Sequence, residues 1–137
     1  MGTRSTIAIQ NGDGTVTGIY CNWDGYLSHN GRILQESYTD EAKVRELIAL
    51  GDISSLGAEI GVKHDFNHCP EGQTNSFARD RGETDCAAAT AHNWRQYCAE
   101  HGQEYDYLFT PGKGWSVSTY NGIYELSVAL ETETEEE

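Results

Sequence analysis

Trp23, Asp24, Gly25 and Tyr26 place two aromatic rings and a carboxylate within four consecutive positions. They follow a stretch that is typical of a β-strand, so the end of that strand would present them together. Two flat rings and a carboxylate could bind a flat ligand or a loop of a partner protein. The structural alternative places Trp23 in the core, makes Asp24 and Gly25 a turn, and lets Tyr26 cover the edge of a sheet.

A second cluster, Arg79, Asp80, Arg81 and Glu83, precedes a stretch that is typical of a helix. Two arginines beside the free amide groups of a helix N-terminus could bind an anion. The alternative is a run of surface ion pairs that orders the end of a long loop. Both interpretations stay open at the level of the sequence.

His64, His68 and Cys69 are side chains that can bind metals. On a helix the two histidines would share a face, but Pro70 and the lack of a helical apolar pattern argue against a helix. No second pair of ligands stands at a recognisable spacing, and the chain has no Cys-x-x-Cys motif. We therefore expect no metal site and no cofactor, with these three residues as the weak metal candidates.

Catalysis has no positive support in the sequence. The chain contains neither a Gly-x-Ser-x-Gly motif for a nucleophilic serine nor a Gly-x-x-x-x-Gly-Lys-Ser/Thr loop for phosphates. A small hydrolase or transferase that uses Asp24, His64 and Asp80 stays as an alternative. The sequence favours a protein that is not an enzyme.

The charge of the chain restricts its partners. Its 137 residues include 22 acidic and 9 basic ones, a formal net charge of −13 at pH 7. Binding to nucleic acid or to an anionic membrane requires clustered Lys and Arg, which the chain lacks. Five of the acids are Glu131, Glu133, Glu135, Glu136 and Glu137. We expect these residues to form a mobile acidic tail over 131–137, after a single domain over 1–130.

Two β-hairpins are predicted from alternating apolar residues on either side of glycine-rich turns. Asn11-Gly12-Asp13-Gly14 joins the first pair of strands, and Pro111-Gly112-Lys113-Gly114 joins the second. Gly18 in the second strand suggests a bulge or a close neighbour. The fold class is therefore predicted as α+β, with a single antiparallel sheet built from two β-hairpins and covered by two or three α-helices.

Three segments are predicted as helices from caps and apolar spacing. A short helix begins at Asn30 and includes Leu34 and Tyr38, a second is capped by Thr39 and ends at Gly51, and a third runs from Thr84 to about His101. Residues 52–56 are expected to form a capped turn, and residues 57–82 a long loop without regular pattern. Residues 123–130 favour a helix, with a strand as the alternative.

Several motifs together give the chain a resemblance to a known family. They are GTRSTIA at the N-terminus, YCNWDGY, NGRIL, LGDISSL, HDF and DRGE. In this order they resemble a family of small uncharacterised proteins carried by bacteriophages, plasmids and other mobile elements. The resemblance implies an accessory protein of a mobile element, with a role in host takeover or defence evasion. The N-terminus has no apolar stretch typical of a secretory signal, so we expect the cytoplasm of the bacterial host and reduced cysteines.

The leading hypothesis is a non-enzymatic accessory protein that binds a host protein or a small anionic ligand, without direct contact with nucleic acid or membrane. An acidic mimic of DNA, inhibiting a nucleic-acid-binding protein, is an alternative. The residues expected to contact the ligand or partner are Arg4, Trp23, Asp24, Tyr26, Asn30, Arg79, Asp80, Arg81 and Glu83.

Overall fold

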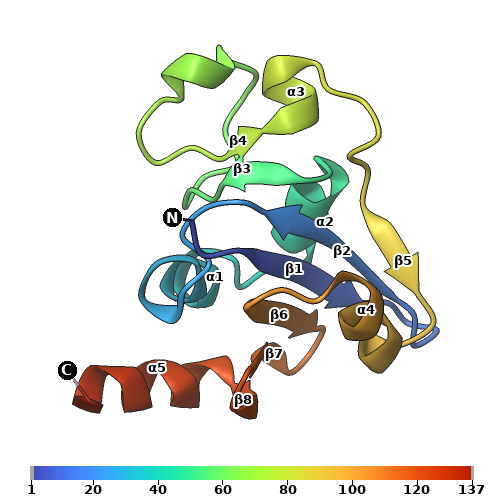
Figure 1. The fold of residues 1–137 in the computed structure, drawn as a ribbon, viewed down its shortest axis with the longest axis vertical. Helices are drawn as coiled ribbons and strands as arrows, with labels where there is room; N and C mark the ends of the chain where they lie inside the picture. The colour runs from blue at the N-terminus through green and yellow to red at the C-terminus, as the bar shows by residue number, and fades with distance from the viewer. Residues whose placement is uncertain (1, 137) are drawn as a thin grey trace.

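The computed structural model describes residues 2–136, with side chains through Thr132, and contains one sheet of eight strands (Figure 1). The strands are β1 (Ser5–Gln10), β2 (Val16–Cys21), β3 (Ile53–Ser55), β4 (Asn75–Ser76), β5 (Ala89–Ala91), β6 (Tyr105–Thr110), β7 (Gly114–Thr119) and β8 (Gly122–Glu125). Their order across the sheet is β4-β3-β2-β1-β6-β7-β8, and β5 pairs with β2. Both predicted hairpins, β1–β2 and β6–β7, are present as antiparallel pairs.

The sheet is mixed, so the prediction of a purely antiparallel sheet is wrong. β1 runs parallel to β6, with Ser5 opposite Tyr105, and β2 runs parallel to β3. Each hairpin is antiparallel, but the two hairpins join through their first strands, which point the same way. The fold class is α+β, with helices connecting strands of one mixed sheet.

Within residues 2–136, five α-helices and two short helical turns accompany the sheet. They are α1 (Arg32–Ser37), α2 (Glu41–Ala49), α3 (Phe77–Arg81), α4 (Trp94–His101) and α5 (Leu126–Glu136), with the π-helical turn η1 (Leu27–Gly31) and the 3-10 turn η2 (Phe66–His68). None of the helices in residues 2–136 combines the length and the apolar character needed to cross a bilayer.

The main core lies between one face of the sheet and helices α1, α2 and α5. Central strands contribute Ile7, Ile9 and Tyr107, and the helices contribute Leu47 and Leu126, all buried. Burial of each such side chain stabilises the fold by roughly 1.5–3 kcal/mol. The buried rings are also tied by hydrogen bonds: Tyr107 Oη donates to Gly25 O at 2.6 Å, and Trp115 Nε1 donates to Tyr38 O at 2.8 Å.

A smaller core on the opposite face lies under α4. Ala8, Val16, Leu108 and Tyr97 form it, with the Trp94 ring stacked on Tyr97 at a centroid distance of 5.7 Å. A Cβ on Gly18 would lie 2.6 Å from Tyr97 Cζ, so the close neighbour expected at Gly18 is the Tyr97 ring. The lack of a side chain at Gly18 lets α4 pack directly on the sheet.

Several predicted elements differ from the observed ones in type or extent. The helix expected from Thr84 is wrong in its first half, because Ala89–Ala91 forms β5 and Asn93 caps α4 by accepting from Gln96 N at 2.8 Å. Asp40, rather than Thr39, caps α2. The turn expected over 52–56 contains β3, and the loop expected over 57–82 contains η2, β4 and α3.

The segment after Gly122 contains both of the alternatives considered for it. Gly122–Glu125 forms strand β8, and Leu126–Glu136 forms helix α5. The helical backbone thus includes most of the segment expected as a mobile tail, whereas Glu137 lies outside the described residues. Leu126, Ala129 and Leu130 attach α5 to the main core.

Candidate functional site

Strand register brings four distant segments to one end of the sheet. Ser5 lies opposite both Cys21 and Tyr105, Tyr105 lies opposite Thr119, and Thr119 lies opposite Gly122. We call this end the Ser5 end. The segments that extend from it are Arg4, residues 22–26, Glu104 and the turn at residues 120–121.

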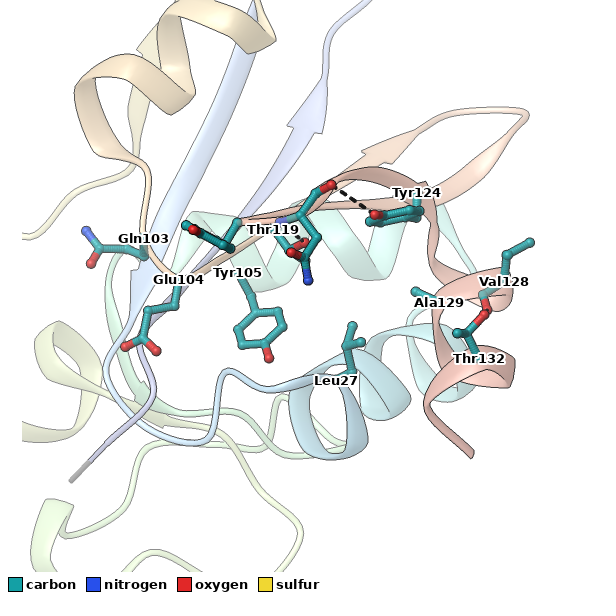
Figure 2. Close-up of a pocket in the computed structure, with 11 residues that line it drawn as sticks. Leu27, Gln103, Glu104, Tyr105, Thr119, Tyr124, Val128, Ala129 and Thr132 are labelled. Atoms are coloured by element: carbon teal, nitrogen blue, oxygen red, sulfur yellow. Dashed lines mark hydrogen bonds between the residues drawn. The ribbon is translucent and has the colours of Figure 1, made fainter. Parts of the chain in front are cut away.

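An open groove of about 850 Å³ lies at the Ser5 end, between α5 and the face of the sheet that carries Tyr105 (Figure 2). We call it the Tyr124 groove. It is lined by Leu27, Gln103, Glu104, Tyr105, Thr119, Tyr120, Asn121, Tyr124, Val128, Ala129 and Thr132. Strands β6, β7 and β8, turn η1 and helix α5 all contribute to it, so its shape depends on the register of these three strands and on how α5 packs beside them.

Large apolar side chains are exposed in and beside the Tyr124 groove. The exposed fractions are 99 % for Tyr120, 41 % for Tyr124 and 47 % for Val128, and Ile123 next to them is also exposed. Tyr124 Oη donates to Asn121 O at 3.0 Å, and Asn121 N donates to Thr119 Oγ1 at 3.1 Å. These bonds hold the turn that presents the rings, although burial does not stabilise the rings there. An exposed apolar surface of this kind is typical of an interaction site.

The charge in the Tyr124 groove is negative. Glu104 is the charged residue among the eleven that line it. Arg4 N lies 3.5 Å from Glu104 Oε1, but the Arg4 guanidinium is directed elsewhere, since its Nε donates to Tyr20 Oη at 2.8 Å. Helix α5, along one wall, carries further glutamates toward its C-terminal end.

The Trp23–Tyr26 cluster lies at the Ser5 end and leads into the groove. Trp23 is 45 % exposed and Tyr26 is also exposed, so neither is a core residue, and Leu27 directly after them lines the groove. Asp24 has a φ of 58°, a left-handed conformation that Asp adopts more readily than most residues. Gly25 passes so close to the first strand that a Cβ would lie 2.7 Å from Ser5 Cβ. The tight turn fixes both rings at the surface.

Asn30 supports this cluster from inside the fold. It is buried, and its Nδ2 lies 3.3 Å from Ser5 Oγ, Cys21 Sγ and Trp23 O. Burial raises the pKa of the Cys21 thiol to about 11, so Cys21 remains a neutral partner in this network. Asn30 is therefore placed to position the Trp23 turn from inside the fold.

Arg79 and Asp80 lie beside β4, at the edge of the sheet opposite to β8 and the Tyr124 groove, and form a buried ion pair. Arg79 Nε and Nη2 donate to the two Asp80 oxygens at 2.9 and 3.0 Å. Arg79 also donates to the carbonyls of Ile60 and Thr74, at 3.0 and 2.8 Å. Its donors thus hold the segment over 57–77 in place. This role is closer to the predicted alternative, ion pairs that order the end of a long loop, than to an anion-binding site.

Asp80 is the centre of this ion pair. Besides Arg79, it accepts from Ser76 N at 2.8 Å and from His64 N at 3.1 Å, and its side chain has no exposed surface. Burial opposes ionisation of the carboxyl, but the hydrogen bonds from Arg79 and from the two amides outweigh it and lower the pKa of Asp80. This arrangement is named the Arg79 clasp. It consists of Arg79, Asp80 and the loop atoms that these two side chains bind.

Arg81 and Glu83 lie at the surface beside the Arg79 clasp. The Arg81 guanidinium pairs with Glu83 and lies 4.2 Å from the centroid of the Phe66 ring. Phe66 in turn stacks on Phe77 at 5.6 Å. The Arg81 guanidinium thus already contacts a carboxylate and an aromatic ring. These contacts argue against an anion-binding site at Arg81.

The weak metal candidates lie in the same region, facing different partners. His64 Nε2 lies 2.9 Å from Asn75 Oδ1, His68 Nδ1 lies 3.1 Å from Asp65 Oδ2 at the surface, and Cys69 Sγ lies 3.3 Å from Gln73 O. Among residues 2–136 as described, no group of three His, Cys, Asp or Glu side chains is arranged to hold a metal ion.

Of the three residues of the alternative catalytic hypothesis, the structure pairs two. His64 Nε2 lies 3.5 Å from Asp80 Oδ2, whereas within the described residues no hydrogen bond or ion pair joins Asp24 to either of them. The thiols offer no activated nucleophile, because burial raises the pKa of Cys98 to about 12 and also raises those of Cys69 and Cys86.

Comparisons of the chain with models of protein families, with curated proteins and with solved structures find no match. Sequence reasoning selected the Trp23 cluster at the Ser5 end but missed the residues of the Tyr124 groove. A usable signal was present: Tyr120, Ile123 and Tyr124 are large apolar residues on both sides of an Asn-Gly turn, where polar residues are usual.

Proposed function

We propose that this protein is a non-enzymatic accessory protein of a mobile genetic element and that it binds a host protein through the Tyr124 groove. The observation that carries the proposal is the exposure of Tyr120, Tyr124 and Val128 around a groove of about 850 Å³. Aromatic residues in such a position are typical of the energetically important part of a protein interface. The link to a mobile element rests on the motif resemblance.

A host protein is favoured over a small anionic ligand. The Arg79 donors are used by Asp80 and by loop carbonyls, and Arg81 is paired with Glu83. The Tyr124 groove has an acidic residue on its wall and would repel an anion. The groove is also open to solvent, which suits a segment of a protein better than an enclosed small molecule.

A host protein is also favoured over mimicry of DNA. A DNA mimic needs carboxylates distributed over a folded face at the spacing of phosphates. The groove instead exposes tyrosines, a valine and a leucine, so the surface that most resembles an interface is apolar.

A capture experiment with matched variants tests the proposal. Tagged wild-type protein, Tyr124→Ala and Val128→Glu would be incubated with bacterial host lysate, with Val62→Glu as the control at an exposed valine outside the groove. We expect the groove variants to lose the captured protein at least tenfold and Val62→Glu to retain it. Equal recovery with all variants would contradict the proposal, provided that circular dichroism shows each variant folded.

A further inference from the structure

We infer that the Tyr124 groove binds a basic segment of its partner and receives an arginine or lysine side chain between its tyrosines and Glu104. This inference rests on the proposed function and specifies the chemistry of the partner. It follows from the aromatic rings, the carboxylate and the charge around the groove.

The rings and the carboxylate supply the two interactions that an organic cation requires. Tyr105, Tyr120 and Tyr124 line the groove together with Glu104, and Figure 2 shows Glu104 and Tyr105 on the side opposite Val128 and Ala129. An ammonium or guanidinium group is attracted by the face of an aromatic ring and forms charge-assisted hydrogen bonds with a carboxylate. The apolar wall of α5 would contact the aliphatic part of the same side chain.

Glu104 has capacity left for such a cation. Its Oε1 lies 3.5 Å from Arg4 N, at the long limit of a hydrogen bond, and a carboxylate can accept about four. In the described part of the chain, none of the ion pairs includes Glu104. The nearby Arg4 guanidinium is held by Tyr20 Oη at 2.8 Å.

Charge also decides between a basic partner and a second copy of this chain. Two copies would each bring a formal charge of −13 and an acidic α5 to the same interface. Like charges brought together cost several kcal/mol, whereas a basic segment is attracted by the same field. The groove is therefore complementary to a cationic segment and not to itself.

A titration monitored by ¹H–¹⁵N NMR tests this inference without the natural partner. The probe is Nα-acetyl-arginine amide, and the control probe is the citrulline amide, which has nearly the same shape but no charge. We expect saturable shifts at groove residues with the arginine probe and at most a tenth of its affinity for the citrulline probe. Equal affinities, or shifts spread over the acidic surface without saturation, would overturn the inference.

Two exposed glutamates give a matched pair of variants. Glu104→Gln removes the carboxylate from the groove, and Glu71→Gln removes the same charge from an exposed loop elsewhere. We expect the affinity for the arginine probe to fall about fivefold in Glu104→Gln and less than twofold in Glu71→Gln. Equal losses in the two variants would mean that the net charge alone attracts the probe, and would overturn the inference.

The same variants separate this inference from the proposed function. If Tyr124→Ala loses the captured host protein while Glu104→Gln keeps it and the arginine probe does not bind, the groove binds a partner of other chemistry. In that case the inference is wrong and the proposed function stands. If Tyr124→Ala keeps the captured protein, the proposed function fails, whatever the titration gives.

Discussion

Charged residues that are adjacent in the sequence have different roles, and burial determines which. Asp80 has no exposed side-chain surface, and Arg79 is mostly buried, so each needs the other and the surrounding polar groups to compensate for lost hydration. Arg81 and Glu83, which follow directly, keep almost half of their side-chain surface in water. The sequence groups all four as one cluster, yet the pair inside the Arg79 clasp binds the backbone of the 57–77 segment, whereas Arg81 contacts that segment from the surface, at the Phe66 ring.

Loss of the Asp80 charge should destabilise the fold at neutral pH. Asp80→Asn leaves Arg79 buried without its counter-ion, which costs about 3 kcal/mol in the free energy of unfolding. Because the folded-state pKa of Asp80 is lowered, its carboxylate stabilises the fold above the unfolded-state pKa. That contribution is lost as the pH falls through the lowered pKa, so wild type and variant should converge below about pH 4.

Urea unfolding at a series of pH values measures this difference. Glu83→Gln is the control, because its exposed pair with Arg81 contributes less than about 1 kcal/mol. A constant difference between wild type and Asp80→Asn from neutral to acidic pH would show that lost packing, and not the charge, accounts for the effect.

At the scale of the elements, local signals were predictable and long-range pairing was not. The turns at Asn11–Gly14 and Pro111–Gly114 identified two hairpins correctly, because glycines in each turn adopt positive φ. The parallel pairing of β1 with β6 brings residue 5 opposite residue 105. No local sequence pattern predicts a pairing between segments so far apart in the chain. Strand β5 was missed because Ala89-Thr90-Ala91 continues an alanine-rich run that favours a helix.

The candidate site follows the same division. The Trp23–Tyr26 cluster could be predicted as a candidate binding site because its residues are adjacent in the sequence. The Tyr124 groove was missed because its lining residues come from five elements and the turns beside them, and the pairing of β6, β7 and β8 is needed to bring them together.

Contact between α4 and the sheet should depend on the absence of a side chain at residue 18. In Gly18→Ala the new Cβ would overlap the Tyr97 hydroxyl, and it would lie 2.8 Å from Ala8 Cβ, so α4 must shift or the ring must move. We expect a loss of about 1–3 kcal/mol in the free energy of unfolding. The control is Gly12→Ala, where the Cβ would meet nothing within 4 Å. Equal unfolding midpoints for the two variants in urea would contradict the direct packing of Tyr97 on β2.

At the scale of the whole molecule, the net charge acts on association more than on the fold. The charge of −13 is unevenly distributed, since Glu131, Glu133, Glu135, Glu136 and Glu137 follow one another closely along the end of the chain. The helix α5 that carries the first four also forms a wall of the Tyr124 groove through Val128, Ala129 and Thr132. A basic partner would therefore be attracted over a distance to the element that it finally contacts.

Neutralising these glutamates should slow association with a captured basic partner and leave dissociation nearly unchanged. A variant with Glu→Gln at the five positions 131, 133, 135, 136 and 137 keeps the length of the chain and changes its formal charge from −13 to −8. Long-range attraction raises association rates by about tenfold or more at low ionic strength, and salt screens it within about 3 Å at 1 M. The association rate of the variant should thus be lower than that of wild type in dilute buffer and equal to it in concentrated salt. Stopped-flow mixing with the captured protein measures both rates, and an increase confined to the dissociation rate would place these glutamates in the contact itself instead of in the steering field.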